Sequence, residues 1–204
     1  MRIWVACKMT IALILLTGIL YPLVMAGIVH LILPNQAEGS LIVRDGRVVG
    51  SALIGQNFAS VRYFHGRPSA AGDKGYDAAS SSGSNLGPTN KTLIETVRAR
   101  ASALREHEPG INHGQIPVDL VTTSGSGLDP EVTPAAAKIQ VARVAKARGL
   151  SEAALTSLIQ THTRGRVFGI LGEPGVNVLE LNLALDSLAT SKRSDVASHI
   201  EARK

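Results

Sequence analysis

The sequence predicts a mixed α/β (α+β) extracytoplasmic domain on one N-terminal transmembrane helix. Three observations predict it: an uncharged apolar run near the N-terminus, two β-branched runs around an Asp-Gly pair, and interleaved strand-like and helix-like patterns beyond them. We divide the 204-residue chain into a short cytoplasmic N-terminus (1–8), a transmembrane helix (9–33), an extracytoplasmic domain (34–188) and a polar basic tail (189–204).

The first expected element is a membrane anchor. Residues 9–33 contain no Asp, Glu, Lys or Arg, and a helix of that length measures about 37 Å, enough to cross a hydrocarbon core of about 30 Å. A cleaved signal peptide is the alternative, but its apolar core is shorter and is followed by an A-x-A-like site, which is missing here. Gly18, Pro22 and Ala26 are spaced by four residues, so they are expected on one helix face that a second membrane helix could approach.

The flanking bases predict the orientation of this anchor. Arg2 and Lys8 precede the apolar run, whereas the first bases after it are Arg44 and Arg47. The positive-inside rule therefore favours a cytoplasmic N-terminus and places the remainder outside the cytoplasm.

The first part of the predicted domain is a hairpin followed by a long loop. After a linker over residues 34–40, strands are expected at 41–44 and 47–54, because Asp-Gly readily adopts the positive φ angles of a type I′ turn. Residues 72–90 are rich in Gly, Ser and Asn and predict a loop.

The second part alternates between helices and strands. A helix is expected over residues 91–108, capped by Thr89 or Asn90, and another from Pro134 to Arg148 that Gly149 ends. A third should begin at Ser151 and reach His162. Strands are predicted over 116–121 and 167–171, and residues 176–188 suggest a short strand leading into a helix.

Composition excludes several functions. Residues 34–188 hold 15 basic and 14 acidic residues, and only seven residues of the whole chain are aromatic, so a nucleic-acid partner is not expected. The single cysteine, Cys7, provides neither an internal disulfide nor a cysteine-based zinc site. No metal site is expected, because the six histidines lack metal-site spacing.

No catalytic residue is expected either. The sequence lacks a phosphate-binding G-x-x-x-x-G-K-[ST] motif and a G-x-S-x-G nucleophile motif. Ser126, His113 and Asp119 could form a hydrolytic triad only if the fold brought them together, which nothing in the sequence indicates. The two loops SSSGSNLGPTN and TTSGSGLDP either form a polar surface for a partner or ion, or use glycine and proline only to turn the chain.

Several motifs, spread almost end to end, resemble the C subunit of the Kdp-type potassium-transporting P-type ATPase, the KdpC family. They are the single apolar span, VGSALIGQNF, YFHGRPSA, SSGSNLGPTN, PVDLVTTSGSGLDP with TPAAA, and GEPGVNVLELNLALD. The chain departs from the family pattern at three positions: His65 stands where Trp is usual, Glu131 where His is frequent, and Gly175 where Arg is common.

The resemblance implies an accessory subunit of a high-affinity potassium importer in the bacterial inner membrane. Its partners would be a channel-like subunit and an ATP-hydrolysing P-type subunit, and the chain would not be an enzyme by itself. A family proposal also gives this subunit a role as a catalytic chaperone that raises ATP affinity, through a glutamine that corresponds to Gln56.

The residues favour a structural role over a nucleotide role. Our topology places Gln56 outside the cytoplasm, and a lone glutamine supplies no cation for phosphate. No cofactor is therefore expected in the chain itself, and ATP enters only as what the resemblance implies, through a ternary complex with the pump subunit. A membrane-anchored extracytoplasmic hydrolase and a ligand sensor remain the alternative functions.

Overall fold

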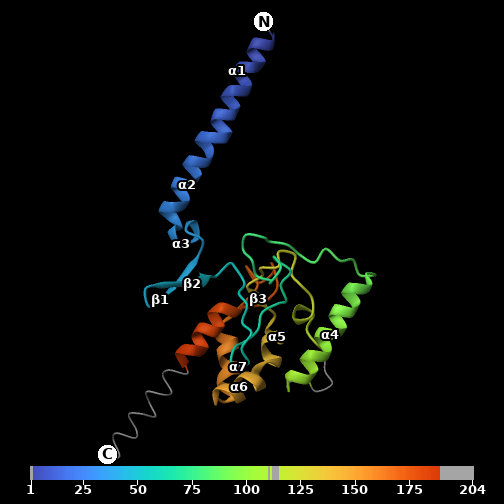
Figure 1. Cartoon of the computed structure of the whole chain (residues 1–204). Helices are drawn as coiled ribbons and strands as arrows, with labels where there is room; N and C mark the ends of the chain where they lie inside the picture. The colour runs from blue at the N-terminus through green and yellow to red at the C-terminus, as the bar shows by residue number, and fades with distance from the viewer. Residues whose placement is uncertain (1, 110, 112–114, 189–204) are drawn as a thin grey trace, which may run out of the picture. The chain divides into compact units, whose positions relative to one another are not determined.

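The computed structural model describes residues 2–109, 111 and 115–188. The chain forms two compact units that divide after Ser51. It combines helices with small antiparallel sheets, which confirms the mixed α/β class with one N-terminal apolar helix (Figure 1).

The first unit begins with a long apolar helix. Its segments are α1 (Arg2–Leu15), a π-helical turn (Leu16–Leu20) and α2 (Tyr21–Ile32). Together they form one 31-residue helix with the length and composition to cross a membrane, the single candidate span among the described residues. This π-helical turn ends two residues before Pro22, which lacks the N–H that a regular helix needs at that position. The Tyr21 N–H instead reaches the Leu16 carbonyl, five residues back.

A hairpin completes this unit. After the short helix α3 (Pro34–Ala37), β1 (Leu41–Arg44) pairs antiparallel with β2 (Arg47–Ser51). Asp45 and Gly46 have φ angles of 52° and 73°, which confirms the predicted turn. The predicted second strand was too long, because β2 ends at Ser51, whose hydroxyl donates to the Gly39 carbonyl.

The second unit packs helices beside a small sheet. Its elements are α4 (Lys91–His107), β3 (Glu131–Val132), α5 (Pro134–Ile139), α6 (Val141–Arg148), α7 (Glu152–Thr161), β4 (Thr163–Arg164) and β5 (Gly175–Asn177). Residues 178–188 are helical, as predicted. The strand order is β3-β5-β4, all antiparallel.

The core of this unit lies where α5, α6, α7, β5 and residues 178–188 meet (Figure 1). Its largest fully buried apolar side chains are Phe64, Val144, Leu155, Val176, Leu181 and Leu185. Residues 52–90 contain no helix or strand, so their position depends on bonds with the rest of the unit.

Predicted helix ends agree closely with the structure. The Asn90 side chain accepts from the Thr92 N–H at 2.8 Å, and Thr133 and Ser151 cap α5 and α7 in the same way. Gly149, at φ 64°, ends α6 in the left-handed conformation.

Three further sequence predictions were wrong. Residues 116–121 form no strand; Val118–Leu120 is a 3₁₀ turn because Pro117 precedes it and Asp119 turns inward to accept from the Thr133 N–H at 2.6 Å. Residues 167–171 form a tight turn closed by a single bridge rather than a strand. The predicted helix from Pro134 to Arg148 is interrupted at Gln140, whose side chain accepts a hydrogen bond from the His65 N–H.

Candidate functional site

Two buried amide side chains hold the irregular segment 52–90 at its centre. Asn182 accepts from the Phe64 N–H and donates to the Phe64 carbonyl, both at 2.9 Å. Gln140 does the same for the next residue, accepting from the His65 N–H at 2.8 Å and donating to its carbonyl at 3.1 Å. These pairs take the place of a neighbouring strand, so Phe64 and His65 are fixed without a sheet.

Arg143 of α6 joins this segment to the end of α4. Its Nε donates to Glu108 Oε1 at 2.6 Å, and its Nη1 donates to the carbonyls of Val61 and Tyr63 at 2.7 and 2.9 Å. Its Nη2 donates to Gln140 Oε1 at 2.7 Å. One guanidinium therefore connects α6, the residue after α4 and the irregular segment.

A second arginine fastens the segment to residues 178–188. Arg148 donates to Asp186 Oδ1 at 2.7 Å and to the Arg62 carbonyl at 2.8 Å. The Tyr63 hydroxyl donates to the other Asp186 oxygen at 3.1 Å, and the Arg148 guanidinium lies 4.5 Å from the centre of the Tyr63 ring.

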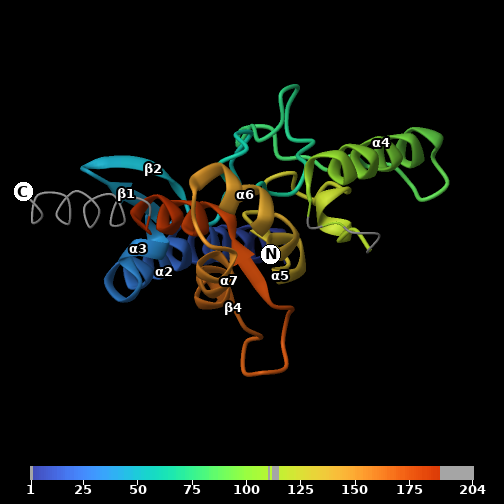
Figure 2. The same ribbon diagram turned by 90° about the horizontal axis from the view of Figure 1, so that it is seen from below.

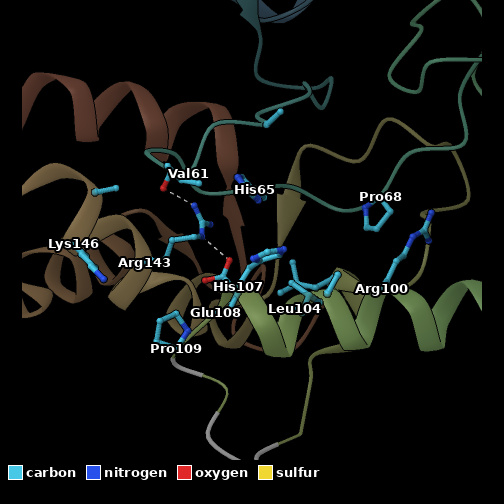
Figure 3. A pocket seen from close by; sticks show the side chains of 14 residues that line it. Val61, His65, Pro68, Arg100, Leu104, His107, Glu108, Pro109, Arg143 and Lys146 are labelled. Atoms are coloured by element: carbon cyan, nitrogen blue, oxygen red, sulfur yellow. Dashed lines mark hydrogen bonds and ion pairs between the residues drawn. The ribbon is translucent and has the colours of Figure 1, made fainter.

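A cavity of about 830 Å³ lies between α4, α6 and the irregular segment. Figure 3 shows Leu104 and His107 of α4 on one side, with His65 and Val61 opposite them. The remaining lining residues are mostly small or apolar: Ala59, Pro68, Ala103, Pro109, Leu120 and Ala147. A second cavity of about 280 Å³ shares His65, Leu104, Glu108 and Leu120 with it.

The charges around the large cavity are mainly positive. Arg100, Arg143 and Lys146 line it with Glu108 as the one carboxylate. Glu108 Oε1 binds Arg143, and no described residue bonds Glu108 Oε2. The cavity could thus receive an apolar group with a negatively charged end.

Burial shifts the pKa values of three residues that line the large cavity, and it lowers that of Arg100 below its usual value. Desolvation raises the pKa of Glu108 above its usual value, against the opposing effect of Arg143. Desolvation also lowers the pKa of His65, and the nearby Arg143 charge lowers it further, although a bond with the Ser60 carbonyl opposes both. The uncharged form of His65 is therefore favoured in the fold.

Among the residues that the structure describes, no serine, threonine or cysteine lines the large cavity, and no His/Cys/Asp/Glu cluster could hold a metal ion. Of the imagined triad, Asp119 binds the Thr133 N–H and Ser126 Oγ accepts from the Leu128 N–H at 3.1 Å, so both stabilise turns. His113 lies outside the described residues.

Gln56, the predicted nucleotide contact, lies in the irregular segment and lines neither cavity. The preceding Gly55 is buried and donates to the Leu128 carbonyl at 2.8 Å. A Cβ at Gly55 would come within 2.5 Å of the Asp129 carbonyl oxygen. The glycine of LIGQ thus permits close packing on the loop that ends in LDP.

The two Gly/Ser-rich loops pack on each other. The Ser82 N–H and the Ser81 hydroxyl both donate to the Ser126 carbonyl at 3.0 Å. A Cβ at Gly127 would meet the Ser82 carbonyl oxygen at 2.4 Å, and one at Gly83 would meet the Gly125 carbonyl at 2.9 Å. These glycines permit loop-to-loop contact, beyond simply turning the chain.

Sequence reasoning missed the residues that organise this site. Glu108 and Asn182 lie far in sequence from Gln140 and Arg143, and most partners of these four side chains are backbone atoms. The available signal was a polar side chain inside an apolar helical run, as Gln140 is in TPAAAKIQVA and Asn182 in VLELNLAL.

Comparison with known proteins assigns the chain to a family. The family described as K⁺-transporting ATPase, c chain, matches residues 3–187. A relative from Gemmatimonas aurantiaca named potassium-transporting ATPase KdpC subunit is 58% identical over 93% of this chain and 94% of its own. A subunit of the same name from Methylibium petroleiphilum is 57% identical over 86% and 92% of the two chains. With nearly its whole length matched, this chain belongs to the KdpC family of K⁺-transporting ATPase c chains.

Proposed function

We propose that this protein is an accessory subunit of an ATP-driven potassium import complex in the bacterial inner membrane. It stabilises the assembly of the channel-like and ATP-hydrolysing subunits. The N-terminus lies in the cytoplasm and the domain after the spanning helix lies outside it, as the positions of Arg2 and Lys8 favour.

The observation that carries this proposal is that Arg2–Ile32 is the single candidate span in the described part of the chain. One helix cannot enclose a pore, so a chain with this span contributes to transport through contact with other subunits. A span exposed along its length is suited to contact with neighbouring membrane helices, and none of its residues is buried within the chain.

The bonding of the irregular segment supports a passive, rigid role for the domain. Arg143, Gln140, Asn182 and Arg148 fix residues 61–65 through seven hydrogen bonds, all of them to backbone atoms. Such bonding favours a body that keeps its shape when it docks. The lining of the large cavity, with no hydroxyl or thiol nucleophile, gives a hydrolase little support.

Deletion of the domain tests the proposal. The chain truncated after residue 33 keeps the anchor, and it should fail to hold the channel-like and ATP-hydrolysing subunits together in mild detergent. The matched control keeps the domain but exchanges residues 9–33 for an unrelated single-pass anchor. Full assembly and potassium uptake by the truncated chain would contradict a role of the domain.

Membrane attachment is tested separately. The full chain should remain in the membrane pellet after carbonate extraction, and a reporter enzyme active only outside the cytoplasm should be active when fused after residue 188. Release by carbonate would contradict the anchor, and an inactive fusion beside an active cytoplasmic reporter would contradict the orientation.

A role in raising the ATP affinity of the pump subunit is the second function that the family resemblance suggests, with Gln56 as the contact. The domain placement proposed above leaves Gln56 on the side of the membrane where ATP is scarce. We therefore give the assembly role precedence, and the substitution that separates the two is described in the Discussion.

A further inference from the structure

A hairpin between β4 and β5 carries a concentrated group of exposed apolar side chains. Figure 2 shows this loop extending away from the helices of its unit. The apolar tip consists of Val167, Phe168, Ile170 and Leu171, which are 55%, 89%, 74% and 58% exposed. Other strongly exposed apolar residues of this unit, such as Leu53, Val61 and Val118, are widely separated in sequence.

The backbone of this tip bonds within itself. Val167 and Leu171 exchange N–H···O bonds at 2.9 and 3.0 Å, while the N–H groups of Gly169 and Ile170 reach the Arg166 and Val167 carbonyls. Four of the five N–H groups from Val167 to Leu171 are therefore satisfied within the hairpin. This lowers the cost of moving the tip into hydrocarbon, where a backbone group without a partner costs several kcal/mol.

Phe168 occupies a conformation that folding alone does not favour. Its φ is 54°, in the left-handed region, where a bulky side chain is uncommon and glycine or asparagine is preferred. The turn thus places its largest apolar ring at the most exposed position. A strained and exposed aromatic residue indicates a surface that binds something apolar.

The base of the hairpin has the opposite character. Arg164 forms an ion pair with Glu131, and Arg166 binds both carboxylate oxygens of Glu173 at 2.8 Å. Charged side chains therefore flank an uncharged tip. This order along the hairpin matches the change from headgroups to acyl chains at a membrane surface.

We propose that the apolar tip inserts into the outer leaflet of the bilayer that holds the chain's own spanning helix. This inference depends on the membrane attachment proposed above. Only residues 33–51 separate that helix from the second unit, a stretch that reaches at most about 65 Å when fully extended. The linkage keeps the tip within reach of lipid at a high effective concentration.

The apolar side chains and the backbone bonding of the tip favour lipid over a groove on another protein. It presents apolar side chains and an internally bonded backbone, whereas protein interfaces also carry hydrogen bonds across the contact. Because Arg164 and Arg166 are already paired with glutamates, insertion should depend on apolar burial rather than on anionic lipid.

Tryptophan fluorescence of the full chain tests this proposal. Trp4 is the sole tryptophan, so Trp4→Phe gives a dark background into which Phe168→Trp is introduced. The matched control is Val118→Trp, at a position that is 66% exposed and away from the hairpin. In phosphatidylcholine vesicles that contain acyl-brominated lipid, quenching of the tryptophan fluorescence should be at least about threefold stronger at position 168 than at position 118. The quenching at position 168 should be unchanged in 0.5 M salt.

If the protein resists carbonate extraction but shows equal, weak quenching at positions 168 and 118, insertion of the tip is refuted and membrane attachment is not. If carbonate releases the protein, both membrane attachment and insertion of the tip are refuted. If the quenching at 168 disappears when the chain is assembled with the other subunits of the complex, a protein partner covers the tip and the proposal is overturned. Ile170→Trp repeats the test at a residue with ordinary backbone geometry and should give the same strong quenching.

Discussion

Arg143 and Glu108 form an ion pair at 2.6 Å, and their side chains are only 8% and 3% exposed. Arg143 extends from α6 and Glu108 immediately follows α4, so the pair fastens α4 to the rest of its unit at the cavity. A charge at this depth has few alternative partners when the other member is removed.

Removal of one side chain of the Arg143–Glu108 ion pair should therefore lower the stability of the fold. Arg143→Met leaves the buried Glu108 carboxylate and two backbone carbonyls without their donor, and we expect a loss of about 3–5 kcal/mol in unfolding free energy. Circular dichroism of the full chain in detergent during heating measures it. Arg143→Lys, which keeps the charge but loses the multiple bonds, should fall between wild type and Arg143→Met. An unchanged melting temperature in Arg143→Met would contradict this role.

The two hydrogen bonds between the Asn182 side chain and the Phe64 backbone predict a smaller loss of stability. Asn182→Ala removes both bonds to the Phe64 backbone in a site where Asn182 is 1% exposed, so we expect destabilisation of about 1–3 kcal/mol. Urea unfolding of the full chain reports the change. Asn57→Ala, at an exposed position of the same irregular segment, should change stability by less than about 0.5 kcal/mol.

The packing of the two Gly/Ser-rich loops can be tested with one methyl group. Gly127→Ala places a Cβ 2.4 Å from the Ser82 carbonyl oxygen at a backbone φ of 67°, so we expect a loss of at least about 2 kcal/mol. Gly87→Ala is the matched control, because a Cβ there meets no atom within 4 Å. Equal melting temperatures for the two variants would show that the loops do not need this contact.

His65 predicts a dependence of stability on pH. Its pKa is lowered in the fold, first by desolvation and second by Arg143, so its contribution is complete above the unfolded-state value of 6.5 and declines as pH falls through the lower folded-state pKa. His65→Trp, which introduces the residue usual in the family, removes this titration. The melting temperature of wild type should fall more steeply than that of the variant between pH 7.5 and 5. Parallel curves would refute the expected contribution.

Gln56→Ala distinguishes the two proposed functions. We expect the ATP affinity of the assembled complex to remain within about twofold of wild type, because one neutral amide offers phosphate no countercharge. Steady-state ATP hydrolysis against ATP concentration gives the apparent KM. A rise of tenfold with intact assembly would establish the nucleotide role and displace our preference.

The elements best predicted from sequence were those with local causes. Asp45-Gly46, the Asn90 cap and the Gly149 stop depend on a few neighbouring residues, and the structure confirms each of them. The uncharged run also predicted a long apolar helix correctly, although that helix begins at Arg2 rather than at residue 9.

The failed predictions have non-local causes. Residues 116–121 have strand-like composition, yet Asp119 binds the Thr133 backbone fourteen residues away and curls the chain. Gln140 interrupts a good helical pattern because the His65 backbone engages its side chain. The cavity could not be predicted for the same reason, because the residues that line it come from segments that are far apart in the sequence and share no common pattern.

The wide turn at Leu16–Leu20 changes what the spanning helix can offer its neighbours. Gly18 lies within that turn, whereas Pro22 and Ala26 both lie on α2, so the spacing of four residues keeps Pro22 and Ala26 on one face but shifts Gly18 relative to them. The extra residue per turn rotates the two halves of the helix against each other. The helix segments before and after this turn can therefore present different faces to neighbouring membrane helices.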